Sequence, residues 1–144
     1  MAIMLTVDQI PAFWEAIKFA SVNADQVEEE FRGKYFNRLL YQLLSGKAQC
    51  FVELSSDRRL RAVAITKVMT DEIRDESTLL ISCLYAFEKR DKSTWSNDLK
   101  ALYQFAKRSD CRTITCWATN EGVVELAEYV GMKQRFKSFI MEVI

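Results

Sequence analysis

The order of apolar runs in the second half of the chain constrains the fold more than any other feature. Residues 77–87, "STLLISCLYAF", have the length and composition of a buried strand, and residues 112–119, "RTITCWAT", have those of a second one. Between them, residues 96–109 carry apolar side chains at helical spacing. Two strands joined by a helix form a right-handed parallel unit, and both faces of such a unit must be covered. The sequence therefore predicts an α/β domain.

The first part of the chain predicts two helices. Residues 3–7 fit either a short strand or the lead into a first helix, which Asp8 would cap and in whose first turn Pro11 would lie. A second helical stretch is predicted over residues 25–44, where apolar side chains keep four-residue steps. Both helices therefore precede the first long strand.

The remaining runs complete a mixed sheet. Residues 48–54 and 60–69 flank the turn "SSDRR" and fit an antiparallel hairpin. A helix is predicted over residues 121–130, and the closing run "RFKSFIMEVI" is predicted as a final strand, alone or after a bend. We therefore expect one domain over residues 1–144, with a central mixed β-sheet (α+β) flanked by helices on both faces.

Charge and hydropathy exclude several classes of protein. Twenty basic residues balance twenty acidic ones, so the basic excess typical of nucleic-acid binders is missing and no nucleic-acid partner is expected. No apolar run is long enough to span a membrane, and we expect no membrane partner. The start, "MAIMLTVDQIP", lacks the pattern of a secretion signal, so we expect a cytoplasmic protein.

The chain contains no histidine, and this limits its chemistry. Histidine is the commonest general base and a frequent zinc ligand, so the Ser-His-Asp triad and most zinc chemistry are excluded. The cysteines at positions 50, 83, 111 and 116 form no CxxC pair, which indicates reduced thiols. We expect no metal site and no disulfide.

A spaced motif follows the second parallel strand. In "NEGVVELAEYVGM", an asparagine at the strand's end is followed by a leucine at +6 and a glycine at +11, which are Asn120, Leu126 and Gly131. This spacing, with the element order of nearly the whole chain, resembles the GCN5-related N-acetyltransferase (GNAT) superfamily. At the level of motifs, the resemblance covers residues 79–132. It implies the GNAT-like acyl-CoA N-acyltransferase fold and a divergent member of that superfamily.

The segment "FEKRDKSTWSND" lies where the resemblance places the family's cofactor loop, which reads Q/R-x-x-G-x-G/A. In this register Arg90 fits the first position, whereas Ser93 and Trp95 replace the two glycines. Glycines let the backbone approach a diphosphate at a helix N-terminus, so the replacements remove part of that chemistry. The alternative is an ordinary charged surface turn that Ser96 or Asn97 would cap.

The resemblance also implies a set of cofactor-binding residues. They lie in the strand predicted over residues 77–87, in this loop and after the strand predicted over residues 112–119. Backbone groups at the strand's end would hold the pantetheine arm and polarise the thioester carbonyl. The implied set is Leu84, Tyr85, Ala86, Arg90, Lys92, Ser93, Thr94, Trp95 and Asn120.

The general acid that the family commonly uses is missing from its usual place. The tyrosine expected seven residues after Asn120 is replaced by Ala127, which has no proton to donate. For the general base, the resemblance points to Glu76, just before the strand predicted over residues 77–87, and Glu53 on the hairpin is a second candidate. The ordinary interpretation of Glu76 is a solvated loop acid, and the sequence favours it.

Two functions are compatible with these residues. The first is a divergent N-acyltransferase that moves an acyl group from acetyl-CoA or another acyl-CoA to an amine on a small molecule or a protein. The alternative is a catalytically inactive GNAT-like scaffold that acts as a binding or structural protein and is related to phages or prophages. Zero net charge also permits self-association, so a homodimer is allowed.

Overall fold

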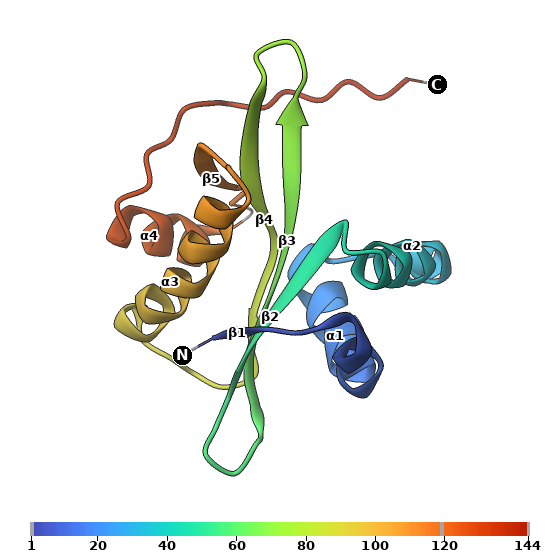
Figure 1. Cartoon of the computed structure of the whole chain (residues 1–144). Coiled ribbons are helices and arrows are strands. Elements are labelled where there is room, and N and C mark those ends of the chain that lie inside the picture. Colours follow the sequence, from blue (N-terminus) through green and yellow to red (C-terminus); the bar gives the residue numbers. More distant parts are fainter. Residues whose placement is uncertain (1, 119, 144) are drawn as a thin grey trace.

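The computed structural model describes residues 2–118 and 120–143. Within them, a five-stranded sheet in the order β1-β2-β3-β4-β5 lies between helices on its two faces (Figure 1). The strands are β1 (Ile3–Met4), β2 (Ala48–Leu54), β3 (Leu60–Asp71), β4 (Glu76–Ala86) and β5 (Thr113–Cys116). The α-helices are α1 (Ile10–Asp25), α2 (Arg32–Leu44), α3 (Lys92–Arg108) and α4 (Glu121–Tyr129). Short 3-10 helices, η1 (Val7–Gln9) and η2 (Glu29–Phe31), precede α1 and α2.

The sheet is mixed, and the predicted hairpin and parallel pair are both confirmed. Strands β1 to β4 pair antiparallel in chain order, and β5 pairs with β4 in parallel. A β-bulge leaves Ser82 on β4 without an opposed residue on β3, because Ile65 pairs with Cys83 and Thr66 pairs with Ile81. Bulges bend the strand that carries them, so β4 changes direction near its middle.

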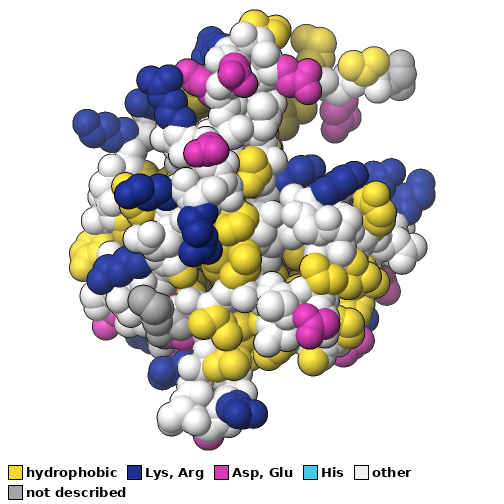
Figure 2. Space-filling model, viewed as in Figure 1, with side chains coloured by type: hydrophobic (Ala, Val, Ile, Leu, Met, Phe, Trp, Pro, Cys, Tyr) yellow, Lys and Arg dark blue, Asp and Glu magenta, His cyan; other side chains and the backbone are white. Residues whose placement is uncertain are grey.

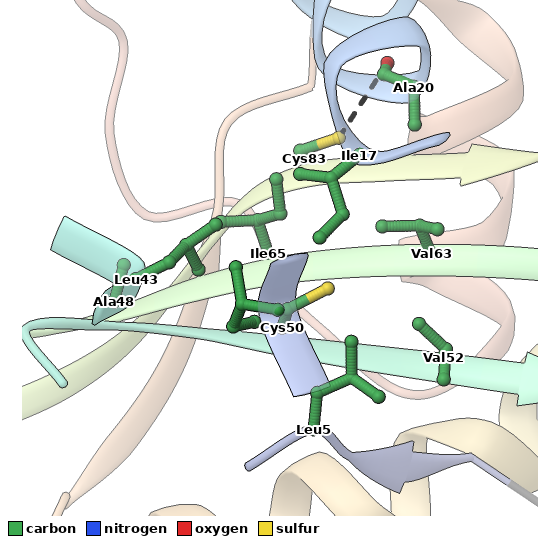
Figure 3. Packing of buried hydrophobic residues seen from close by; sticks show 11 residues of the cluster. Leu5, Ile17, Ala20, Leu43, Ala48, Cys50, Val52, Val63, Ile65 and Cys83 are labelled. Atoms are coloured by element: carbon green, nitrogen blue, oxygen red, sulfur yellow. Dashed lines mark hydrogen bonds between the residues drawn. The ribbon is translucent and has the colours of Figure 1, made fainter. Parts of the chain in front are cut away.

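Each face of the sheet carries its own apolar core, because alternate residues of a strand point to opposite faces. Helices α1 and α2 cover one face, and α3 and α4 lie on the other (Figure 1). Figure 3 shows the first core, where Ile17 and Ala20 of α1 meet Val63 and Cys83 of the sheet. The second core is Phe51, Ala64, Leu79, Leu102 and Ala106. The sheet is thus buried on both faces.

Two helix starts that were predicted in the first part of the chain are wrong. Helix α2 begins at Arg32 rather than at residue 25, because Gln26 takes a left-handed conformation (φ 52°) that ends α1. Asp8 does not cap α1 but lies inside η1. The chain begins that turn earlier, where the backbone N–H of Thr6 donates a hydrogen bond of 2.8 Å to Gln9 Oε1.

The predicted final strand is also wrong. Residues 133–143 follow α4 without regular secondary structure, and Figure 2 shows apolar side chains of this closing segment standing away from the body of the molecule. Phe139, Ile140 and Val143 are 91%, 90% and 98% exposed. A strand needs a hydrogen-bonding neighbour, and over the described residues the outer edge of β5 pairs with none.

The structure adds three facts about side-chain chemistry and hydropathy. None of the helices in the described part of the chain combines the length and apolar character that crossing a membrane requires. Within those same residues, no group of three or more His, Cys, Asp or Glu side chains is placed so that it could hold a metal ion. The cysteines are free thiols, and burial raises the pKa of Cys50 and of Cys83 to about 12. Neither thiol is therefore ionised at neutral pH.

Candidate functional site

Strands β4 and β5 pair at one end only, and an opening separates them at the other. The pairing stops at Ile81 and Cys116, where β5 itself ends, whereas β4 continues to Ala86. The bulge at Ser82 follows the last pair directly and bends β4 at that point. Over residues 82–86, the edge of β4 that faces away from β3 therefore has no strand partner among the described residues.

A cavity of about 340 Å³ lies at this opening. Its lining comes from the C-terminal end of α1, from β2 to β4, from α3, from the end of β5 and from α4. Most of the lining is apolar, and of the predicted cofactor residues it includes Leu84, Tyr85, Trp95 and Asn120. This size and character are those of a small-molecule site.

A second, smaller hollow of about 230 Å³ shares a wall with the first. Arg90 and Thr94 line this hollow, and Glu53 lines both hollows. Ala86, Lys92 and Ser93, which were also predicted as cofactor residues, line neither of the two. The structure therefore brings part of the predicted set to two adjacent hollows and leaves these three residues outside both.

Arg90 is buried between two carboxylates. Its Nη2 lies 2.7 Å from Glu53 Oε2 and 2.5 Å from Asp98 Oδ2, and the three side chains are 5%, 10% and 9% exposed. The guanidinium carbon of Arg90 lies 4.2 Å from the ring centroid of Trp95, so the residue that replaces a glycine stacks on the arginine. One cation faces two acids, and burial raises the pKa of Asp98.

The first turn of α3 is capped by Asp91, not by Ser96 or Asn97. Asp91 Oδ1 accepts hydrogen bonds from the Thr94 hydroxyl (2.8 Å), the Thr94 backbone N–H (2.9 Å) and the Ser93 hydroxyl (2.8 Å). These bonds, with those from Thr94 the largest cause, lower the pKa of Asp91 to about 2. Because aspartate is among the strongest N-caps, the helix starts earlier than predicted.

The start of α3 does not fit the diphosphate of an acyl-CoA as its residues stand. A diphosphate needs free backbone N–H groups at a helix N-terminus and a cation that is available to it. Asp91 already places a carboxylate there, and Arg90 is shared by Glu53 and Asp98. The opening beside β4, by contrast, fits an uncharged chain that hydrogen-bonds to a strand edge.

Of the two predicted catalytic acids, Glu53 lines the cavity and Glu76 does not. Glu76 is the first residue of β4, and its Oε1 lies 2.7 Å from Arg112 Nη1. Ala127 lines the cavity where the resemblance expects tyrosine, and Tyr129 is 55% exposed. The wall that α4 contributes therefore offers no hydroxyl at position 127.

Two of the predicted cofactor residues, Asn120 and Lys92, make structural contacts around the opening. Asn120 Oδ1 caps α4 by accepting a hydrogen bond of 3.0 Å from the backbone N–H of Val123. Lys92 Nζ lies 3.7 Å from Glu125 Oε2, which connects the start of α3 with α4. Exposed ion pairs of this kind add little stability, so Asn120 is the stronger of the two contacts.

Asp25 and Asp98 line the cavity, although the sequence analysis singled out neither. Asp98 is buried on the same face of α3 as Leu102 and Ala106. A carboxylate on the apolar stripe of an amphipathic helix is the signal that would have found it. Asp25 had no such signal, because its place at the cavity depends on where α1 ends.

Comparison with solved structures finds matches over nearly the whole chain at low sequence identity. A probable acetyltransferase matches with a TM-score of 0.79 and 12% identity, over 100% of this chain and 98% of the other. An aminoglycoside acetyltransferase from an uncultured soil metagenomic sample, in complex with sisomicin, gives 0.74 and 13%, over 100% and 96%. A predicted acetyltransferase from Clostridium acetobutylicum, with acetyl-CoA, gives 0.76 and 11%, over 99% and 95%.

These matches show the fold. The mixed sheet and its flanking helices are those of the GNAT acetyltransferases, as the element order and the motif around Asn120 predicted. No family model matches the sequence, and a search of the curated proteins gives no match either. The likeness therefore lies in the arrangement of the elements, including the strands that border the cavity.

Proposed function

We propose that the chain is an N-acyltransferase that moves an acyl group from a thioester donor of the acyl-CoA type to an amine. The observation that carries this proposal is the opening between β4 and β5, because it leaves an unpaired strand edge in the wall of an apolar cavity. Acetyltransferases, one of them acting on aminoglycosides, share the same arrangement of elements.

The edge of β4 is the part of the chain that would bind and activate the donor. Backbone N–H groups over residues 82–86 that point away from β3 are available to a carbonyl oxygen. Fixed N–H dipoles in a cavity with little water stabilise negative charge that develops on such an oxygen. An acyl-CoA supplies the activated acyl group as a thioester. The amine loses one proton as its nitrogen is acylated, and the released thiolate takes up one proton.

Side chains contribute less to this reaction than the backbone does. Ala127 cannot protonate the leaving thiolate, so water is the proton donor that we propose there. Glu53 is engaged by Arg90 and Glu76 by Arg112, and a role for either carboxylate as general base stays a prediction. We therefore expect slow turnover with simple amines.

A titration with acetyl-CoA, followed by the melting temperature and by the amide NMR shifts, tests the proposal. We expect millimolar binding, with the largest shifts at residues 82–86, because the start of α3 does not fit the diphosphate. Asp91→Asn keeps an N-cap acceptor and removes its charge, so it should bind acetyl-CoA roughly tenfold more tightly. Asp110→Asn, beyond the other end of α3, is the control and should leave the affinity for acetyl-CoA unchanged.

The outcomes separate the two candidate functions. Shifts along β4 together with release of free thiol in the presence of an amine support an acyltransferase. The absence of any shift at millimolar acetyl-CoA, in the wild type and in Asp91→Asn alike, contradicts it. A role in binding or structure would then be the better description of the chain.

A further inference from the structure

A carboxylate held in place by a tyrosine stands at the α1 side of the cavity. Asp25 is the last residue of α1, and it lines the cavity together with Asn23 and Gln26. Tyr35 on α2 donates a hydrogen bond of 2.6 Å from its hydroxyl to Asp25 Oδ2. A carboxylate has about four lone-pair sites, so one such bond fixes the group and leaves acceptor capacity on it.

The charge around the cavity is negative. Among the described residues, its charged lining consists of Asp25, Glu53 and Asp98, and Arg90 outside the lining compensates only part of this charge. Asp98 Oδ1 is buried without a hydrogen-bond partner within the described part of the chain, and so are Nε and Nη1 of the neighbouring Arg90. The acidic lining of the cavity favours a ligand with positive charge.

One aromatic side chain lines the cavity, and two further rings pack against it. Tyr85 lines the cavity, and its ring centroid lies 5.8 Å from that of Phe19 and 5.1 Å from that of Phe87. Phe19 is 53% exposed and Phe87 is 37% exposed, so part of this aromatic group faces solvent. Such rings offer contact area to a flat apolar body, and their faces attract cations.

We propose that Asp25, held by Tyr35, binds the ammonium group of the acceptor, and that this acceptor is a primary amine on a flat apolar body. The inference rests on the proposed function, because it names the acceptor of the same cavity. The ammonium donates to the carboxylate of Asp25, and the apolar body lies against Tyr85 and the rings beside it.

The same contact supplies the neutral amine that acylation requires. One proton passes from the ammonium nitrogen to the carboxylate of Asp25, and the nitrogen lone pair that this frees forms the bond to the acyl carbon while the bond from that carbon to the thioester sulfur breaks. The acylated nitrogen then loses its second proton to water, and the released thiolate takes up one proton from water. Partial burial raises the pKa of Asp25, against the smaller effect of the hydrogen bond from Tyr35, and a raised pKa favours proton uptake. Asp25 thus touches the reacting nitrogen, and Tyr35 positions Asp25.

Isothermal titration with 2-phenylethylamine and with its neutral analogue 2-phenylethanol tests the inference. The wild type should bind the amine at least about tenfold more tightly than the alcohol, and Asp25→Asn should lose this preference. Glu15→Gln, an exposed acid on the same helix, should keep it. Tyr35→Phe should weaken amine binding by about threefold and leave alcohol binding unchanged, because the carboxylate is no longer held. Melting curves show whether each variant is folded.

The outcomes distinguish this inference from the proposed function. Equal affinities of the wild type and Asp25→Asn for the amine overturn the inference, and so does a wild type that fails to prefer the amine. Thiol release from acetyl-CoA with 2-phenylethylamine is measured in parallel. If Asp25→Asn releases thiol as fast as the wild type, the inference about Asp25 is wrong and the proposed acyltransferase function stands. If Asp25→Asn abolishes amine binding but the wild type releases no thiol, the amine-binding site is supported and the proposed function is contradicted.

Discussion

At the scale of single residues, Arg90 is the buried cation that faces two of the three acids of the cavity. The sequence assigned it to phosphate binding, and the structure places it between Glu53 of β2 and Asp98 of α3. Neither partner could be read from the sequence, because β2 is distant in the chain and Asp98 lies inside a helix. Leu84 and Tyr85, which the resemblance implied as cofactor residues, line the cavity, and their role in binding a cofactor stays a prediction. Residues that only tertiary packing brings together, such as Asp25, were missed.

Replacing Arg90 by methionine should lower the free energy of unfolding by about 3–5 kcal/mol at neutral pH, because two buried carboxylates lose their cation. Denaturant unfolding measures this loss. Adding Glu53→Gln and Asp98→Asn removes both charges and should recover most of it. Arg61→Met, at the exposed pair with Glu88, is the matched control and should change stability little. A similar small change for Arg90→Met would contradict the prediction.

The loss caused by Arg90→Met should shrink in acid. Burial raises the pKa of Asp98 above its unfolded value, so the folded protein loses stability as the pH rises through that raised pKa. Without the arginine this effect grows, because nothing then favours the charged form. Unfolding curves at about pH 4 and at neutral pH should therefore show the smaller difference from the wild type at the lower pH. Equal differences would show that the carboxylates are not the cause.

At the scale of elements, the long strands were predictable and several boundaries were not. Strands β2, β3 and β4 are apolar runs bounded by turns, and such runs are local signals. The start of α3 depends on which of several polar side chains caps it, and Asp91 makes the hydrogen bonds. The prediction of a final strand was wrong for another reason. A strand forms only where a neighbouring strand accepts and donates its hydrogen bonds, and the sequence of the segment does not say whether such a neighbour exists.

Amide hydrogen exchange should show that β4 changes character near its middle. Residues 78–81 pair on both sides, so all of their amides should exchange slowly. Over residues 82–86, the amides that point away from β3 should exchange much faster, because no strand covers them. Mass spectrometry of short peptides, or NMR, measures both groups. Uniformly slow exchange up to residue 86 would mean that the opening between the strands is closed in solution.

At the scale of the whole molecule, neither the closing segment nor the outer edge of β5 has a strand partner among residues 2–118 and 120–143. Phe136 and Met141 are 82% and 89% exposed, like their apolar neighbours in the segment. An exposed apolar segment and an open strand edge are features that proteins usually cover. A second copy of the chain would supply both partners at once, in a homodimer of the kind that zero net charge permits.

The molar mass in solution should therefore rise with protein concentration. Light scattering over the micromolar range measures it, and Ile140→Lys should shift the chain towards the monomer by placing a charge in the closing segment. Tyr103→Lys, at an exposed ring on α3, is the control and should leave the mass unchanged. A wild type that stays monomeric at every concentration would rule out self-association through this segment.

Glu53 stands in the wall that the two hollows share. An anion that drew Arg90 towards the smaller hollow would weaken its hold on Glu53 and Asp98, and the larger cavity would become more negative. Two ligands of opposite sign would then assist one another, each raising the affinity for the other by the same factor. Through the shared carboxylate of Glu53, occupation of one hollow would in this way change the affinity of the other hollow for its ligand.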